Sequence, residues 1–407
     1  MIPRLKPYLG IEEILAIFKD RKNAVQHFES AFAKRFHTDH AIAFPYGRSA
    51  LWAFFKSLNL DPFEIVQPAY TCSVVAHATV LSGNTPVFVD INLTDYNMNL
   101  DLLTKAISSK TRVIIPTHIF GYAMDIHKIQ AIVTSAEQRY GHKVWVIQDC
   151  AHSFDAQFKG ASVIGAGDAA LFGLGISKQI TSIFGGMFTT NNEEIAKIVR
   201  DFRNKHFKLP SWKKSLKRYL YLLAVYPAFQ SSIYGLVYWL QEKTPLLDHL
   251  TKDFHLDEKI HFPPDYIDQM TNIEALVGLE QLKKYSEIQY KRREIAKMYF
   301  NEIHPVENWV LPPRIDGATY SHFAIRTINR DELLAMYAST GVQLGQLIEY
   351  SMPHHPAYNA YTNGKTFPNS LLCSQSMINL PIHPGLTKKQ ISKIINNTNS
   401  HFLLNEK

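Results

Sequence analysis

Short apolar runs alternate with helical stretches through the first half of the chain, and this alternation constrains the fold more than any other feature. The apolar runs are residues 40–44, 64–70, 85–91, 112–121 and 143–153, and stretches with helical spacing of apolar residues separate them. Strands that are apolar on both faces and are joined through helices form a mostly parallel sheet covered by helices. The sequence therefore predicts an α/β fold that binds a ligand at the carboxyl ends of its strands.

The chain has 407 residues, which is more than one hydrophobic core usually holds. The alternating pattern ends near residue 204, resumes as one long helical stretch over 271–303, and is followed by short mixed elements. We therefore predict a large domain over 1–300, with an inserted apolar and aromatic helical segment at about 205–264. A smaller C-terminal α/β domain is predicted over 301–407.

Charge and cysteine content narrow the possible partners and the compartment. The net charge of +7 favours anionic partners such as phosphorylated small molecules or acidic lipid. Cys72, Cys150 and Cys373 have no metal-type spacing, so we expect no metal site and a reducing compartment. The first residues lack the apolar core of a signal peptide, which predicts a cytoplasmic protein. A nucleic-acid partner is not expected, because the Lys and Arg residues that cluster at 205–218 adjoin an apolar segment, 219–240.

Three groups at predicted strand ends could act together. Residues 46–50 (YGRSA) end a strand and open a helix, whose N-terminus favours an anion. Asp149 follows an apolar strand, where a carboxylate is costly without a partner. Lys178 is the one charged residue in the stretch 170–191, and an amine kept from water is a nucleophile. Each has a structural alternative: a turn that binds nothing, a capping Asp149, and a surface Lys178 whose stem lies along apolar neighbours.

Pyridoxal phosphate (PLP) is a ligand that needs all three groups. Its phosphate binds backbone donors, its ring nitrogen pairs with a carboxylate that keeps it protonated, and its aldehyde reacts with a lysine. On the trio alone, binding of PLP and purely structural roles remain equally open.

The sequence also resembles the DegT/StrS-type sugar aminotransferases, which have the fold-type I, aspartate aminotransferase-like PLP architecture. The matching segments, in matching order, are 47–51, 85–91, 113–126, 148–156, 167–178, 185–191, 271–282 and 380–387. They cover nearly the whole chain outside the insertion. The resemblance implies a PLP-dependent transaminase in which Lys178 binds the cofactor and then moves protons, while Asp149 pairs with the ring nitrogen.

The resemblance also implies further contacts with the cofactor. The N–H groups of Ser49 and Ala50, in the turn that begins at Gly47, would hold the phosphate. His152 would lie near the phenolic oxygen, and Ser177 is another candidate for the phosphate. Dehydratases of the family carry His at the lysine position, so Lys178 favours transamination.

Several positions depart from the family pattern. Arg48 replaces a threonine, and it is either a compensating phosphate ligand or a solvent-facing turn residue. Cys72 stands where an aromatic residue stacks on the ring, with Tyr70 two positions earlier. Gly173 replaces a phosphate-binding serine, and Ile267 replaces an asparagine that reaches the partner subunit's phosphate.

The resemblance further implies the substrates and the assembly. The loop with His354, His355 and Tyr350 would reach toward substrate. Glutamate or glutamine would donate the amino group to a ketosugar, most simply a nucleotide-linked one used for polysaccharide or glycoconjugate synthesis. A homodimer with shared active sites is expected. The alternatives are an aminotransferase for a lipid-linked or membrane-presented substrate, and a non-catalytic regulator or scaffold that retains the PLP fold.

The insertion contains a stretch, 219–240, without a charged residue, and six Lys and Arg residues with no acid among them precede it. Its length would suffice for one membrane crossing. A single crossing would split the predicted domain, so two possibilities remain. One is a pair of helices, broken at Pro227, that pack on the body or on a dimer partner. The other is a helical hairpin in a membrane interface, reached through residues 205–240.

Overall fold

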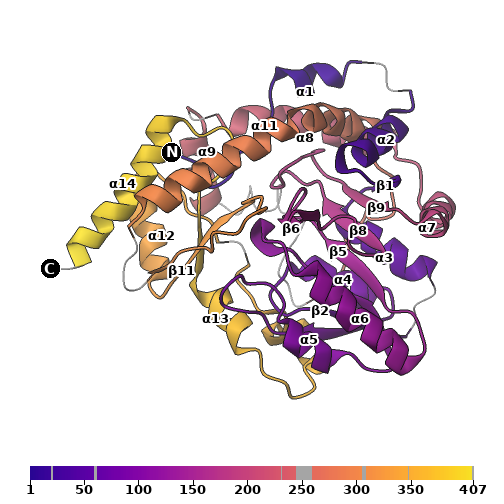
Figure 1. The fold of residues 1–407 in the computed structure, drawn as a ribbon. Helices are drawn as coiled ribbons and strands as arrows, with labels where there is room; N and C mark the ends of the chain where they lie inside the picture. Colours follow the sequence, from indigo (N-terminus) through magenta and orange to yellow (C-terminus); the bar gives the residue numbers. More distant parts are fainter. Residues whose placement is uncertain are drawn as a thin grey trace.

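A computed structural model describes residues 1–19, 22–58, 62–230, 232–243, 259–304, 309–346 and 348–405. Its centre is a seven-stranded sheet (Figure 1). In spatial order the strands are β1 (His40–Phe44), β9 (Gly186–Thr190), β8 (Ala169–Gly173), β5 (Trp145–Asp149), β4 (Thr111–Ile114), β2 (Glu64–Pro68) and β3 (Thr85–Val89). All run parallel except β9, which is antiparallel to both of its neighbours. This arrangement confirms the predicted α/β class.

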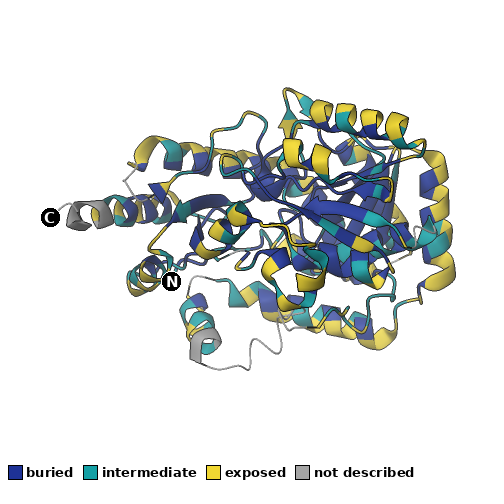
Figure 2. Ribbon diagram, turned by 90° about the horizontal axis from the view of Figure 1, so that it is seen from below, coloured by how far each residue is buried: buried dark blue, intermediate teal, exposed yellow. Residues whose placement is uncertain are grey.

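Helices cover both faces of the sheet, as the doubly apolar strands require. One face packs against α3 (Gly47–Ser57), α4 (Ser73–Leu81) and α7 (Glu193–His206). The other face packs against α2 (Ala24–Phe36), α5 (Leu100–Ala106), α6 (Ile126–Tyr140) and α11 (Asn272–Glu302). Figure 2 shows the buried sheet between helices whose outer sides are exposed. Neighbouring residues of one strand, such as Ile147 and Val146, therefore enter different clusters of the core.

A close backbone contact fixes the turn between β1 and α3. Tyr46 forms a bridge with Gly185, and a side chain at Gly186 would overlap the backbone of Tyr46 and Gly47. Gly185 has a φ of 119°, which a side chain would strain. The two glycines therefore let β9 approach the start of α3.

A second, antiparallel sheet lies at the other end of the molecule. It contains β10 (Trp309–Val310), β11 (Phe323–Thr327) and β12 (Met377–Leu380), beside α12 (Arg330–Ser339), α13 (Pro368–Ser376) and α14 (Lys388–Asn405). Two short 3-10 helices (Met352–His354 and Pro356–Tyr361) and the hairpin of β6 (Gln157–Phe158) and β7 (Ala161–Ser162) complete the elements near the site. The end of α11 shares one core with this sheet and with Phe120 of the large unit. We propose a domain boundary near residue 300, where α11 ends.

The described part of the insertion forms two helices, α8 (Trp212–Ala228) and α9 (Tyr234–Lys243), and α8 ends one residue after Pro227. α8 lies along α11, next to α1 (Ile11–Ala16), at the top of Figure 1. Residues 244–258 of the predicted insertion lie outside the described residues. Every helix in the described ranges is too short or too polar to cross a bilayer.

Buried ion pairs attach α8 to the body of the protein. The guanidinium of Arg218 donates to Glu274 at 2.9 Å, to Asp265 at 2.8 Å and to the hydroxyl of Tyr46 at 3.0 Å. Tyr46 in turn donates to Asp265 at 2.7 Å, and Lys214 donates to the carbonyl of Asp268 at 2.8 Å. The Glu274 side chain is fully buried, and Arg218 is the cation that forms an ion pair with it. Through these contacts α8 is tied both to α11 and to the turn at the start of α3.

Replacing Arg218 with methionine should strongly destabilise the protein, because it leaves the Glu274 carboxylate buried without a cation. Breaking a buried pair from one side costs about 3–5 kcal/mol. Equilibrium unfolding in urea would measure this loss. Lys217→Met, at the next and exposed position, is the matched control and should change the free energy of unfolding by less than about 0.5 kcal/mol. Equal effects of the two substitutions would contradict the proposed role of the ion pairs.

Candidate active site

The predicted catalytic pair meets at the carboxyl edge of the sheet. Asp149 is the last residue of β5 and pairs in register with Leu171 of β8. Lys178 follows β8 after a turn in which its own N–H donates to the carbonyl of Gly175. Burial raises the pKa of Asp149 and lowers that of Lys178, and the charge of each group partly opposes the shift of the other. The structure therefore brings together two residues that are well separated in the chain.

The Asp149 carboxylate is buried and accepts two hydrogen bonds. One comes from the N–H of Ala151 at 3.0 Å and the other from the hydroxyl of Thr117 at 3.3 Å. Burial raises the pKa of Asp149, and the hydrogen bond from Ala151, the charge of Lys178 and the bond from Thr117 only partly oppose this. Among the described residues, no Lys, Arg or His forms an ion pair with Asp149. The site therefore holds a carboxylate that a bound cation would stabilise.

Lys178 is partly buried, and its pKa is lowered by burial against the opposing effects of Cys72 and Asp149. Its aliphatic chain passes Gly173, where an added Cβ would lie 3.3 Å from Cε. A side chain at 173 would therefore lie against the stem of the lysine. Ser177, the other candidate next to the lysine, is exposed.

Two histidines lie together beside this pair. The rings of His152 and His322 are 4.8 Å apart, and His152 stacks on Phe120 at an interplanar angle of 14°. Burial, Lys178 and the neighbouring histidine hold the pKa of His152 well below its usual value. The pKa of His322 is also strongly lowered, first by burial and then by Arg292. His322 was not predicted from the sequence, where a single histidine before a short strand carries no signal.

The turn predicted to bind phosphate is present at the start of α3. The N–H groups of Ser49 and Ala50 both donate to the carbonyl of Tyr46, at 3.1 and 3.2 Å. They are thus already part of the helical hydrogen-bonding pattern, which the sequence did not indicate. Gly47 packs on β8, where an added Cβ would lie 3.2 Å from the carbonyl of Phe172. Arg48 lies over the ring of Tyr46 at 5.2 Å.

The candidate cofactor residues that follow β2 lie close to the C-terminal part of the chain. Tyr70 is fully buried in the shared core, and burial raises the pKa of its hydroxyl. Cys72 caps α4 and is close enough to Lys178 to influence its pKa. Tyr350 accepts a hydrogen bond from the N–H of Ser73 at 2.9 Å, and burial raises its pKa. Cys72 and Tyr350 therefore lie at the same strand end as Lys178.

The two histidines of the predicted substrate loop differ in exposure. His354 is exposed and bonds to the hydroxyl of Ser351 at 3.0 Å, whereas His355 is partly buried and accepts from the N–H of Ala357 at 3.3 Å. The rings of His355 and Tyr350 are 6.4 Å apart. Their contact with substrate stays a prediction.

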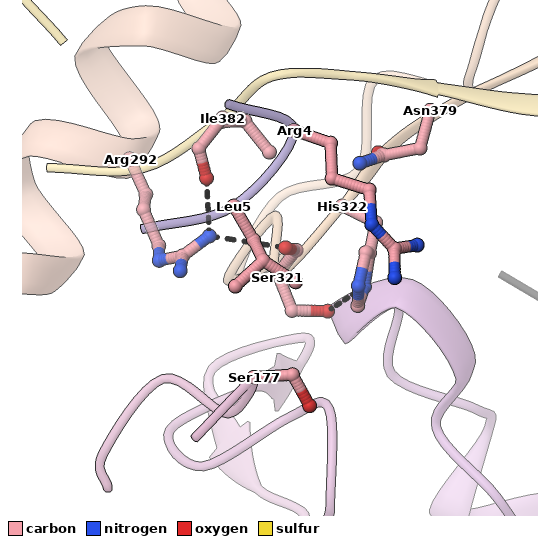
Figure 3. A pocket seen from close by; sticks show the side chains of 8 residues that line it. All are labelled: Arg4, Leu5, Ser177, Arg292, Ser321, His322, Asn379 and Ile382. Atoms are coloured by element: carbon pink, nitrogen blue, oxygen red, sulfur yellow. Dashed lines mark hydrogen bonds between the residues drawn. The ribbon is translucent and has the colours of Figure 1, made fainter. Parts of the chain in front are cut away.

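A small cavity of about 20 Å³ adjoins Ser177, in the turn that carries Lys178 (Figure 3). This volume holds about one water molecule. It is lined by Arg4, Leu5, Ser177, Arg292, Ser321, His322, Asn379 and Ile382. Arg292 donates to the carbonyls of Ser321 at 3.0 Å and Ile382 at 2.5 Å, and burial lowers its pKa to about 10. Within the described part of the chain neither Arg4 nor Arg292 is paired with a carboxylate, so the cavity is electropositive.

Comparison with known proteins agrees with this geometry. The model of the DegT/DnrJ/EryC1/StrS aminotransferase family matches residues 16–399. An uncharacterized protein of Methanocaldococcus jannaschii is 27% identical over 97% of this chain and 96% of its own length. The spore coat polysaccharide biosynthesis protein SpsC of Bacillus subtilis is 24% identical over 97% and 95%. The sugar aminotransferase CalS13 of Micromonospora echinospora has the same fold, with a TM-score of 0.77, 18% identity and coverage of 98% of this chain and 100% of that one.

The match to the family model spans nearly the whole chain and thus confirms the resemblance found in the sequence. The chain belongs to the DegT/DnrJ/EryC1/StrS aminotransferase family, whose members are PLP-dependent sugar aminotransferases.

Proposed function

We propose that the protein transfers an amino group from glutamate or glutamine to the keto group of a nucleotide-linked sugar that is used in polysaccharide or glycoconjugate synthesis. The observation that carries this proposal is that a buried carboxylate, Asp149, and a desolvated amine, Lys178, lie near each other at the carboxyl edge of the sheet. Similarity to SpsC, a polysaccharide biosynthesis protein, supports the pathway class.

The described residues fit PLP. When bound, PLP supplies a protonated ring that withdraws electrons from the reacting carbon. Asp149 would pair with the ring nitrogen, since none of the described residues places a cation within hydrogen-bonding range of this buried carboxylate. Lys178 would bind the aldehyde and then carry the proton, because its lowered pKa keeps more of the amine neutral near pH 7.

Other parts of the site have supporting roles. His152, stacked on Phe120, would face the cofactor near its phenolic oxygen. The start of α3, with Gly47, Arg48, Ser49 and Ala50, would hold the phosphate through its dipole and the Arg48 guanidinium. Tyr70, Cys72, Gly173 and Ser177 remain candidate contacts. His354, His355 and Tyr350 are the candidate contacts for the sugar.

We assign the carboxylate of the amino donor to the cavity between Arg4, Arg292 and His322. Two guanidinium groups without carboxylate partners in the described structure attract an anion, and a guanidinium fork suits a carboxylate. The cavity adjoins Ser177, so an anion there would lie close to Lys178. The Arg292 guanidinium donates to two carbonyls and that of Arg4 to one, the carbonyl of Gln346 at 3.0 Å, so Arg4 is the residue to test.

We further propose a homodimer with shared active sites in the cytoplasm. The three cysteines are free thiols, which suits a reducing compartment. The segment 205–240 provides a means of reaching the inner face of the membrane. The exposed leucines of α8 favour a second candidate function, amination of a lipid-linked or membrane-presented substrate. A PLP-fold scaffold without activity is the remaining alternative.

Substitution of Lys178 with alanine should abolish the protein-bound cofactor band near ~420 nm and its response to glutamate. Absorbance spectra of both proteins, recorded with added PLP before and after glutamate, would show this. Lys208→Ala, at an exposed lysine outside the site, serves as the control and should keep the wild-type spectrum. A wild-type protein without the band, even after addition of PLP, would favour the scaffold.

Asp149→Asn should stabilise the protein without cofactor at pH 7, although it should slow the reaction with glutamate on the order of 100-fold. The native pKa of Asp149 is raised, so wild-type stability falls as pH rises through and above the usual carboxyl range. The gain from asparagine should therefore shrink toward pH 3. Unfolding in urea at both pH values measures it, and a loss of stability at pH 7 would contradict the desolvation argument.

Arg4→Gln should raise the glutamate concentration for half-maximal conversion about 10-fold, because a charge-assisted hydrogen bond contributes about 1.5–3 kcal/mol. Rapid mixing with glutamate, followed by absorbance, would give this concentration. Arg4→Lys keeps the charge and should recover part of the affinity. Arg314→Gln, a surface control, should leave this glutamate concentration unchanged. If Arg4→Gln also left it unchanged, the donor carboxylate would have to bind elsewhere.

A further inference from the structure

Helix α8 has the reverse of the usual polarity for a surface helix. Its buried side carries two cations, Lys214 and Arg218, together with Leu222. Its exposed side carries Trp212, Leu216, Leu220 and Leu223, and Trp212 is 71% and Leu220 55% exposed. Surface helices normally direct charges to water and leucines to the core. An exposed leucine row therefore indicates a surface that contacts something other than water.

The inward cations explain how this orientation is stable. Arg218 is neutralised by Asp265 and Glu274, and Lys214 donates to backbone carbonyls. Rotation of α8 would hide the leucines but would strip the buried Glu274 and the partly exposed Asp265 of their cation. The leucines consequently stay outside because the ion pairs hold them there.

Helix α1 extends the apolar surface. Ile17, which follows α1, packs in one cluster with Leu222 of α8, and the rings of Phe18 and Tyr219 are 6.3 Å apart. The outward residues of the α1 segment are Ile11, Leu15 and Phe18, and Phe18 is 66% exposed. The outer face of α1 and α8, defined by these three residues and the four of α8, thus combines exposed apolar residues of two helices that are in contact. Leu236 and Trp239 of α9 are also exposed.

We propose that this outer face binds the surface of an anionic phospholipid bilayer. Lys213 and Lys217 are exposed beside the leucines, and neither forms an ion pair within the described structure. No acidic residue occurs between Lys205 and Leu240. Leucine and tryptophan with neighbouring lysines are the composition of helices that lie in a membrane interface.

Charge favours lipid over a second copy of the chain. In a two-fold dimer the same patch meets itself, so Lys213 and Lys217 would be brought close to the same cationic patch of the second copy. Anionic headgroups instead neutralise them. The inference rests on and deepens the membrane contact proposed above for residues 205–240. It is separable from transamination, since lipid binding is measured without any substrate and can fail while transamination is intact.

Co-sedimentation with vesicles tests the proposal on the full chain. Wild-type protein should bind vesicles of phosphatidylcholine with one-third phosphatidylglycerol at least 10-fold more strongly than phosphatidylcholine alone, and less strongly in 1 M salt. The double variant Leu220→Glu, Leu223→Glu should lose at least 10-fold of this binding. Ile328→Glu, at an isoleucine of the small unit that is 74% exposed, is the matched control and should bind as the wild type does.

Two results would overturn the proposal. One is wild-type protein that binds the anionic vesicles no better than the double variant does. The other is a double variant that changes a larger wild-type assembly into a smaller one in analytical ultracentrifugation, which would assign the face to a second copy. An unchanged thermal melting curve and glutamate reaction would show that the double variant is folded.

Discussion

The parallel pairing of β5 with β8 is the constraint on which the active site depends. It sets Asp149 opposite Leu171, so that the carboxylate lies beside the strand whose following turn carries Lys178. The same layers that hold the strands together remove both groups from water. Burial raises the pKa of Asp149 and lowers that of Lys178, and so disfavours the charged form of each. The fold thus retains a pair that is costly without a ligand, which is a common property of sites that bind one.

A second constraint links the insertion to this site. Arg218 of α8 bonds to the hydroxyl of Tyr46, the residue that precedes α3. The same guanidinium holds Glu274, whose carboxylate caps α11 by accepting from the N–H of Thr271. The insertion is therefore part of the structure that positions the turn at Gly47. A displacement of α8 would therefore first displace the turn at the start of α3.

The sequence could predict the strands and the large helices from their apolar spacing. It could also predict that Asp149 and Lys178 lie near each other, because both residues follow apolar strands. It could not predict the cavity of Arg4, Arg292 and His322, because the N-terminal arm, α11 and the segment before β11 meet only in three dimensions. Nor could it show that the N–H groups of Ser49 and Ala50 donate to the carbonyl of Tyr46. A Gly turn indicates where a helix starts, but not which backbone N–H groups are left to bind a ligand.

The insertion shows most clearly where periodicity stops being informative. Helical spacing separates a face with Lys214 and Arg218 from a face with Leu216 and Leu220, and ordinary amphipathicity would bury the leucines. The acids that decide otherwise, Asp265 and Glu274, lie 47 and 56 residues beyond Arg218.

The outward orientation of the α8 leucines has a consequence for catalysis. Because α8 is clamped to the turn before α3, a lipid surface that holds its leucines would also hold the active site at a fixed position relative to the bilayer. A flexible anchor would only raise the local concentration of enzyme. A rigid one also orients it, which matters when the next enzyme to take the amino sugar acts at the same membrane.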